Sequence, residues 1–410
     1  MTPTARPALR AFLADARERQ TSLLAALVRA PSDNPPGDCA PHAGRTAALL
    51  EELGFTVERH VVPEDLVRAH GMRAVTNLVV RRRFGADGPV IALNAHGDVV
   101  PPGEGWTADP YGAEIRDGWM YGRGAAVSKS DIATYAFALL ALERAGIAKR
   151  GAVELHITYD EETGGEIGPR WLLAQGISKP DLAIGAGFSY GVVEAHNGCL
   201  HLEVEVTGRS AHAAKPWTGV DALEAATHIL SALYAWRPSL AARVSAFPGI
   251  GAPQLTVGLI AGGINTNVVP DRVTFRLDRR IVPEERPEQV EAELRTLIEG
   301  AGQAVAGAKV AVRRILLAAP LTPLPGGAEL TALLCAHASR VMGEEITAGG
   351  VPLYTDARHY AAAGVPIALY GAGPRSIEDA NAHRADERVP LADLHKATEV
   401  VALTLADLLA

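Results

Sequence analysis

Three groups of polar residues have types and spacing that suit metal-assisted or acid–base chemistry. In the first, His96 is followed by Asp98, and a metal-binding imidazole usually donates its second N–H to such a carboxylate. In the second, Glu161 and Glu162 are adjacent, so one carboxylate can bind a metal while the other acts as a base towards water. The third contains His383, which alone would be unremarkable.

Each group follows a short apolar run that predicts a buried strand. These runs are Val90–Asn94, Val153–Ile157 and Ile367–Tyr370. Folds of the α/β class bind ligands at the carboxyl edge of the sheet, where all three groups would then lie. Taken singly, a capped loop histidine and a solvated acidic loop are the alternatives for the first two groups. Their shared position at strand ends favours a site.

The elements that would position these residues belong to two kinds of domain. Strands alternating with helices before residue 198 predict a mostly parallel sheet covered by helices, hence an α/β fold. Alternation in 200–206 and 273–278, with helices predicted at 220–236 and 287–301, indicates a smaller α+β domain of ferredoxin-like type. We therefore expect a catalytic domain in 1–197 and 312–410, interrupted by an inserted domain in 198–311.

Composition excludes several classes of protein. The chain has 410 residues, 48% of them hydrophobic and 21% charged, which is globular composition. Its formal net charge of −8 argues against nucleic-acid or anionic-membrane binding. The residues Cys39, Cys199 and Cys335 are too widely spaced for a disulfide scaffold. With neither a secretory leader nor a membrane span evident, a cytoplasmic protein is expected.

Ordered motifs along nearly the whole chain resemble the co-catalytic zinc peptidases and deacylases, which include acetylornithine deacetylase, succinyl-diaminopimelate desuccinylase, glutamate carboxypeptidase and aminoacylase. The matching segments are Pro31–Gly37, His96–Pro101, Tyr121–Ala126, Asp160–Gly165, Gly208–His212, Asn267–Pro270, Asp278–Arg280, Asp356–Arg358 and Ala382–His383. The resemblance implies a metal-dependent hydrolase of a C–N bond in a small carboxylate-bearing substrate.

The resemblance also implies roles for residues of the catalytic domain. His96 would bind the first metal and Asp98 would orient it. Glu161 would be the general base, whereas Glu162 and His383 would bind the second metal.

Three further roles fall in the inserted domain. His212 would stabilise the developing oxyanion, and Asn267 and Arg280 would bind a substrate carboxylate. A structural ion pair with Asp278 is the alternative for Arg280. Members of this family also suggest a homodimer formed through this domain.

Two metal ligands of the family are missing from this sequence. A valine, Val127, stands where the family has a bridging aspartate, and Ala186 stands where it has an acidic ligand of the first metal. Neither side chain offers a lone pair. These losses argue against a second metal.

The ligands that remain suit a single divalent ion. His96, Glu162 and His383 form a set of two histidines and one carboxylate, which fits zinc first and manganese, cobalt or iron as alternatives. Asp131 and His196 are candidates for substitute ligands. We therefore expect a mononuclear or weakly bound metal.

Hydrolysis of an amide bond, by an N-acyl amino acid deacylase or a dipeptidase, is the leading functional hypothesis. Hydrolytic deamination of an activated or aromatic amine is the alternative within enzymes of this fold. A binding homologue that has lost catalysis, and a lyase or isomerase using Glu161 as a base, are alternatives of other classes.

Overall fold

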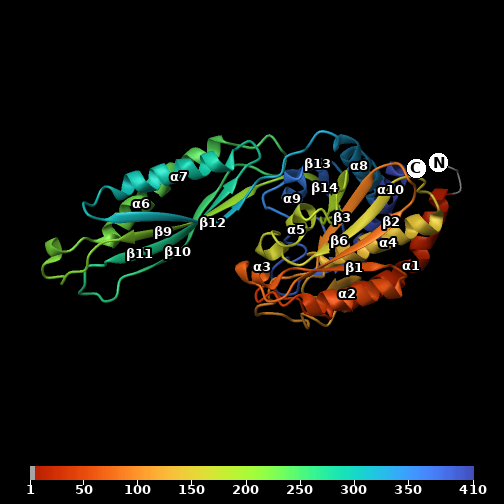
Figure 1. The fold of residues 1–410 in the computed structure, drawn as a ribbon, viewed down its shortest axis with the longest axis horizontal. Helices are drawn as coiled ribbons and strands as arrows, with labels where there is room; N and C mark the ends of the chain where they lie inside the picture. The colour runs from red at the N-terminus through yellow and green to blue at the C-terminus, as the bar shows by residue number, and fades with distance from the viewer. Residues whose placement is uncertain (1–4) are drawn as a thin grey trace. The chain divides into compact units, whose positions relative to one another are not determined.

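The structure is a computed structural model that describes residues 5–410 (Figure 1). Its contacts divide the chain into two compact units. The first unit contains the residues up to Glu194, Pro323–Gly349 and Thr355–Ala410, and the second contains Ala195–Thr322 and Gly350–Tyr354. The prediction that no secretory leader is present concerns the N-terminal residues. Residues 1–4 among them lie outside the described residues.

An eight-stranded sheet forms the framework of the first unit. In spatial order its strands are β1 (Val57–Val61), β2 (Thr76–Arg83), β6 (Ala152–Thr158), β3 (Val90–His96), β7 (Leu182–Gly185), β14 (Ile367–Leu369), β8 (Val192–His196) and β13 (Ala348–Val351). The central strands β6, β3, β7 and β14 run parallel, whereas β1, β2 and β8 pair antiparallel towards the edges. The predicted α/β fold with a mostly parallel sheet is confirmed.

Helices pack around this sheet. They are α1 (Ala5–Val28), α2 (Ala40–Glu52), α3 (Glu64–Ala69), α4 (Lys129–Ala145), α5 (Pro169–Ala174), α8 (Ala328–Met342), α9 (Ala357–Ala362) and α10 (Leu391–Leu408). The helix α4 contacts β3 and β6 and is itself covered by α1 and α10. A separate three-stranded sheet joins β4 (Glu114–Arg116), β5 (Trp119–Tyr121) and β15 (Arg388–Pro390).

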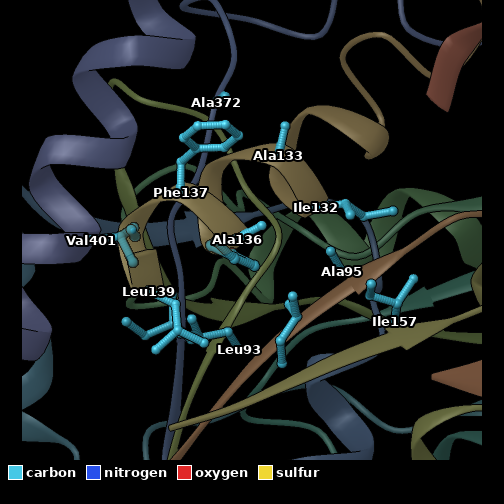
Figure 2. Close-up of a cluster of buried hydrophobic side chains, with 14 of the residues drawn as sticks. Leu93, Ala95, Ile132, Ala133, Ala136, Phe137, Leu139, Ile157, Ala372 and Val401 are labelled. Atoms are coloured by element: carbon cyan, nitrogen blue, oxygen red, sulfur yellow. The ribbon is translucent and has the colours of Figure 1, made fainter. Parts of the chain in front are cut away.

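The core beneath the catalytic edge is built around α4. Its side chains Ile132, Ala136 and Phe137 are fully buried, in a cluster that includes Leu93 of β3 and Ile157 of β6 (Figure 2). Each large apolar side chain removed from water in this way contributes about 1.5–3 kcal/mol. This packing fixes the start of α4 against the strands whose ends carry the predicted site.

The second unit has the strand and helix order of a ferredoxin-like fold. Along the chain its elements are β9 (Gly198–Thr207), α6 (Ala222–Trp236), β10 (Leu255–Gly262), β11 (Arg272–Ile281), α7 (Pro287–Gly302) and β12 (Lys309–Ala318). Its antiparallel sheet has the order β10-β11-β9-β12. One face of this sheet packs on α6 and α7 through alternate residues of β9, Leu200 to Val206.

The second unit ends later in the chain than residue 311, where the inserted domain was predicted to end. The strand β12 pairs with β9 from Lys309 to Ala318, so its residues belong to the inserted unit. An alternating strand looks the same in sequence whichever sheet it joins. Its partner therefore decides the boundary.

No helix within residues 5–410 is long and apolar enough to cross a membrane. The thiols of Cys39 and Cys199 are buried, whereas Cys335 is partly buried.

Candidate active site at the carboxyl edge of the large sheet

The parallel strands bring the predicted residues of the first unit to one edge. The strand β3 ends at His96, which pairs in register with Thr158 at the end of β6. A 3₁₀ turn follows β6 and contains Glu161 and Glu162. Because β3 and β6 are parallel neighbours, residues far apart in sequence lie together at this edge (Figure 1).

The carboxylate of Asp98 holds this turn in place. It is fully buried and accepts the backbone N–H of Glu161 at 3.3 Å and of Glu162 at 3.2 Å. The amide of Asn34 donates to it at 2.9 Å. The Nδ1 atom of His96 lies 3.0 Å from the main-chain oxygen of Asp98 and 3.3 Å from its Oδ1. This arrangement leaves Nε2 of His96 facing the glutamates.

The donor atoms of His96, Glu161 and Glu162 form a group that can hold a cation. One ligand atom from each lies within 4.8 Å of the others, and Nε2 of His96 is 3.9 Å from Oε2 of Glu161. The Oε1 atom of Glu162 is buried, and Nε2 of His383 lies 3.3 Å from it. Two carboxylates and an imidazole are ligands that zinc accepts. The residues present therefore fit a divalent ion.

The charges at this edge shift the pKa of Glu161. Burial and the neighbouring carboxylates of Glu162 and Asp98 raise the pKa of Glu161 to about 7, against the opposite effect of His96 and His383. A carboxyl group with a pKa near the working pH can both accept and return a proton.

A loop in left-handed backbone conformation places His383 beside Glu162. Its Nε2 lies 3.3 Å from Oε1 of Glu162, and this contact raises the pKa of His383. The carboxylate of Asp386 anchors the same loop by accepting the N–H groups of Thr107 and Ala108 at 2.9 and 3.1 Å. The structure thus brings His383 to the glutamates, although its side chain is half exposed.

A buried ion pair supports the backbone at Val127. The carboxylate of Glu387 accepts the N–H groups of Ala126 and Val127, both at 3.1 Å. It also pairs with Arg123 at 2.6 Å, and both side chains are 1% exposed. Neither Glu387 nor Arg123 was assigned a role from the sequence, although Arg123 stands in the matched segment Tyr121–Ala126. Arg123 and Glu387 are too far apart in the sequence for this ion pair to be predicted from residue spacing.

The carboxylate of Asp131, near the start of α4, accepts hydrogen bonds from two backbone groups. Asp131 accepts the N–H of Gly187 at 3.2 Å and of Ala372 at 2.8 Å, one on each oxygen. Burial raises the pKa of Asp131 to about 8. The N–H of Ala186 donates to the carbonyl of Asn94 at 2.9 Å. Asp131 therefore connects the backbone segments at Gly187 and Ala372. Both of its oxygens are used in this way, whereas we had considered it as a substitute metal ligand.

The second predicted substitute ligand, His196, belongs to the second unit. Its side chain is buried, and its Nδ1 lies 2.9 Å from the carbonyl oxygen of Asn197. Its backbone also bridges to Leu321. These contacts describe a histidine fixed within that unit.

Three further predicted residues lie in the second unit. His212 and Asn267 are both exposed. Their segments are neighbours in the structure, where the N–H of Ala213 donates to the carbonyl of Asn267 at 3.0 Å. The guanidinium of Arg280 instead pairs with Asp278, with Nε 3.0 Å from Oδ1. This is the ion pair considered as the alternative for Arg280.

One acidic residue next to the site was missed as a functional candidate. Asp356 is buried, and its Oδ2 accepts a hydrogen bond from Thr158 at 3.4 Å. Burial, with the nearby charge of Glu161, raises the pKa of Asp356 well above its usual range. The following Arg358 donates to the carbonyl of Gly164 in the glutamate turn. The only sequence signal was their place in the matched segment 356–358.

Lys129, the first residue of α4, is fully buried, and its Nζ donates to the carbonyl of Ala30 at 2.9 Å. Burial lowers the pKa of Lys129 to about 7.

The low pKa of Lys129 predicts a pH dependence of stability. The unfolded chain keeps this proton to higher pH, so the free energy of unfolding should rise as pH increases above 7. Between about pH 7 and about pH 9 we expect wild type to gain at least about 1 kcal/mol relative to Lys129→Met. Urea unfolding at both pH values measures this difference, and parallel pH dependence of the two proteins would contradict it.

Comparison with known proteins finds relatives that match nearly the whole chain. The chain is 32% identical to succinyl-diaminopimelate desuccinylase of Gluconacetobacter diazotrophicus, with 100% of this chain and 99% of that protein covered. The desuccinylase of Rhodospirillum centenum is also 32% identical, over 91% and 93% of the two chains. An M20 family metallo-carboxypeptidase from Sulfolobus solfataricus has the same fold, with a TM-score of 0.76 at 18% identity and coverage of 94% and 98%.

The family model described as peptidase family M20/M25/M40 matches residues 92–407, a stretch that contains every predicted site residue. Proteins of this family are generally metal-dependent, and the sheet edge carries a group of side chains that could hold a metal ion. The chain therefore belongs to peptidase family M20/M25/M40 and is a hydrolase of amide bonds.

Proposed function

We propose that this protein removes the acyl group from a small N-acylated amino acid, using one divalent metal ion. The observation that carries the proposal is the donor set itself: His96, Glu161 and Glu162 lie together, whereas Val127 and Ala186 offer no ligand. The desuccinylase relatives support an N-succinyl or similar N-acyl amino acid as the first substrate class to test.

In this proposal His96 and Glu162 hold the metal, with His383 beside them at 3.3 Å from Glu162. A bound divalent ion polarises the scissile carbonyl and lowers the pKa of water in its vicinity. Asp98 fixes the His96 ring and the glutamate turn at the same time, so the donor set is arranged before substrate binds.

Glu161 acts as the general base. It takes a proton from the attacking water and returns it to the amine that leaves. Burial raises its pKa to about 7, which suits both transfers near neutral pH. We propose that His212 of the second unit stabilises the oxyanion and that Asn267 helps to bind the substrate carboxylate. Arg280 would have to exchange its ion pair with Asp278 for that carboxylate.

The function is tested by measuring the free amine released from N-succinyl-diaminopimelate, other N-acyl amino acids and dipeptides. The protein is stripped of metal and then reconstituted with zinc, manganese, cobalt or iron. We expect turnover of at least one N-acyl amino acid that requires the added metal. Turnover of dipeptides alone, or none in this panel with any metal, would contradict the proposal.

Restoring the two missing ligands should raise the number of metals bound at the sheet edge. We expect the wild-type edge to bind one zinc tightly and the double variant Val127→Asp, Ala186→Glu to bind two, because each added carboxylate supplies a charged donor. Equilibrium dialysis with elemental analysis counts the ions. Every protein in this test also carries Cys199→Ser, because Cys199, His201 and Asp278 are a second group of possible metal ligands in the inserted unit. Val127→Asn with Ala186→Gln is the matched control of similar size. Two zinc ions bound tightly by the Cys199→Ser protein, without the two added carboxylates, would overturn the single-metal proposal.

A further inference from the structure

A second group of metal-binding side chains lies within the inserted unit. Cys199 and His201 are two residues apart on β9, and Asp278 is directly opposite His201 on β11. Side chains two residues apart on a strand point to the same face. The intervening Leu200 points into the core under α6 and α7. The three polar side chains therefore share the sheet face turned away from the helices.

These side chains converge on one oxygen atom. The Oδ2 atom of Asp278 lies 2.8 Å from Nε2 of His201 and 3.5 Å from Sγ of Cys199. One ligand atom from each of the three residues lies within 4.8 Å of the others. The Cys199 side chain is buried, whereas His201 and Asp278 are 35% and 30% exposed. The sulfur of Cys199 is therefore the buried donor of the three, whereas the donors of His201 and Asp278 are partly exposed to solvent.

The surrounding charges suit a divalent ion. A thiolate and a carboxylate together carry two negative charges, which balance a doubly charged cation. Arg280 binds the other oxygen of Asp278, with its Nε 3.0 Å from Oδ1, so Oδ2 is the atom that faces Cys199 and His201. Sulfur and imidazole favour zinc and similar transition metals over magnesium or calcium.

We propose that Cys199, His201 and Asp278 bind a zinc ion or a similar transition-metal ion. Cysteine, histidine and aspartate are all zinc ligands, and three of them leave the fourth tetrahedral position to solvent. All three come from β9 and β11 of one sheet, and none belongs to the donor set of His96, Glu161 and Glu162. This site does not depend on the proposed deacylase function.

Cobalt is the probe that separates the two sites. We expect Co²⁺ titrated into the metal-free, reduced full-length protein to produce a thiolate-to-cobalt charge-transfer band in the near ultraviolet. Only a cobalt ion bound by sulfur gives this band, and the donor set at the large sheet contains no sulfur. The band should saturate by two added equivalents, one for each proposed site, and disappear when Zn²⁺ is added, since zinc generally binds such ligands at least as tightly.

Variants assign the band to its ligands. We expect Cys199→Ser and His201→Ala each to abolish it, with circular dichroism showing that each variant is folded. His201 is partly exposed, so its variant keeps the test decisive even when Cys199→Ser folds poorly. The control Cys335→Ser should retain the band, and so should Glu162→Gln at the large sheet. Absence of the band in wild type, or its persistence in a folded Cys199→Ser or His201→Ala protein, would overturn the proposal.

Discussion

Replacing Glu161 with glutamine should lower kcat for amide hydrolysis by about 10²–10⁴-fold, the contribution that a positioned general base usually makes. Glutamine has nearly the same shape, and the backbone N–H of residue 161 can still donate to Asp98. What the variant loses is the carboxylate that accepts the proton. KM should change little if Glu161 acts mainly in the transition state.

Metal content distinguishes this role from that of a ligand. Glu161→Gln should keep the metal at the sheet edge, whereas Glu162→Gln should lose that metal and the activity, because Glu162 has the buried oxygen that faces His383. The exposed Glu344, which pairs with Arg375, provides the control, and Glu344→Gln should behave as wild type. A Glu161→Gln protein that retains full turnover would exclude the general-base role. One that loses its metal would make Glu161 a ligand instead.

Replacing Glu387 with alanine should reduce the free energy of unfolding by about 3–5 kcal/mol, because Arg123 would keep a buried charge without a partner. The pair is 1% exposed on both sides. The same change removes the acceptor for the N–H groups of Ala126 and Val127. The measurement is a urea unfolding curve, with the midpoint and slope compared with those of wild type.

Two controls separate the buried charge from other effects of this substitution. The double variant Arg123→Met, Glu387→Met should recover part of the loss, since removing both charges leaves none unpaired. The exposed pair of Glu344 and Arg375 should tolerate Glu344→Ala with little change in stability. Equal effects of Glu387→Ala and Glu344→Ala would show that burial does not govern the cost.

Much of the fold could be predicted from the pattern of apolar residues. The runs in 90–94 and 153–157 became β3 and β6, and the helices predicted at 220–236 and 287–301 became α6 and α7. The end of the inserted domain was placed too early, because β12 is assigned by its partner strand. Local patterns determine the type of an element, whereas long-range pairing determines the sheet to which it belongs.

The site residues show the same division between what local sequence patterns predict and what long-range pairing determines. The sequence by itself determined that His96, Glu161 and Glu162 stand at the ends of buried strands and that Val127 and Ala186 bring no ligand. These features depend on residue type and on short-range spacing.

Only the tertiary structure decided how the remaining polar groups are used. It committed both oxygens of Asp131 to backbone N–H groups, joined Glu387 to Arg123, and brought Cys199, His201 and Asp278 together on adjacent strands. The physical reason is that a buried polar group needs a partner, and the chain topology decides which distant group can reach it.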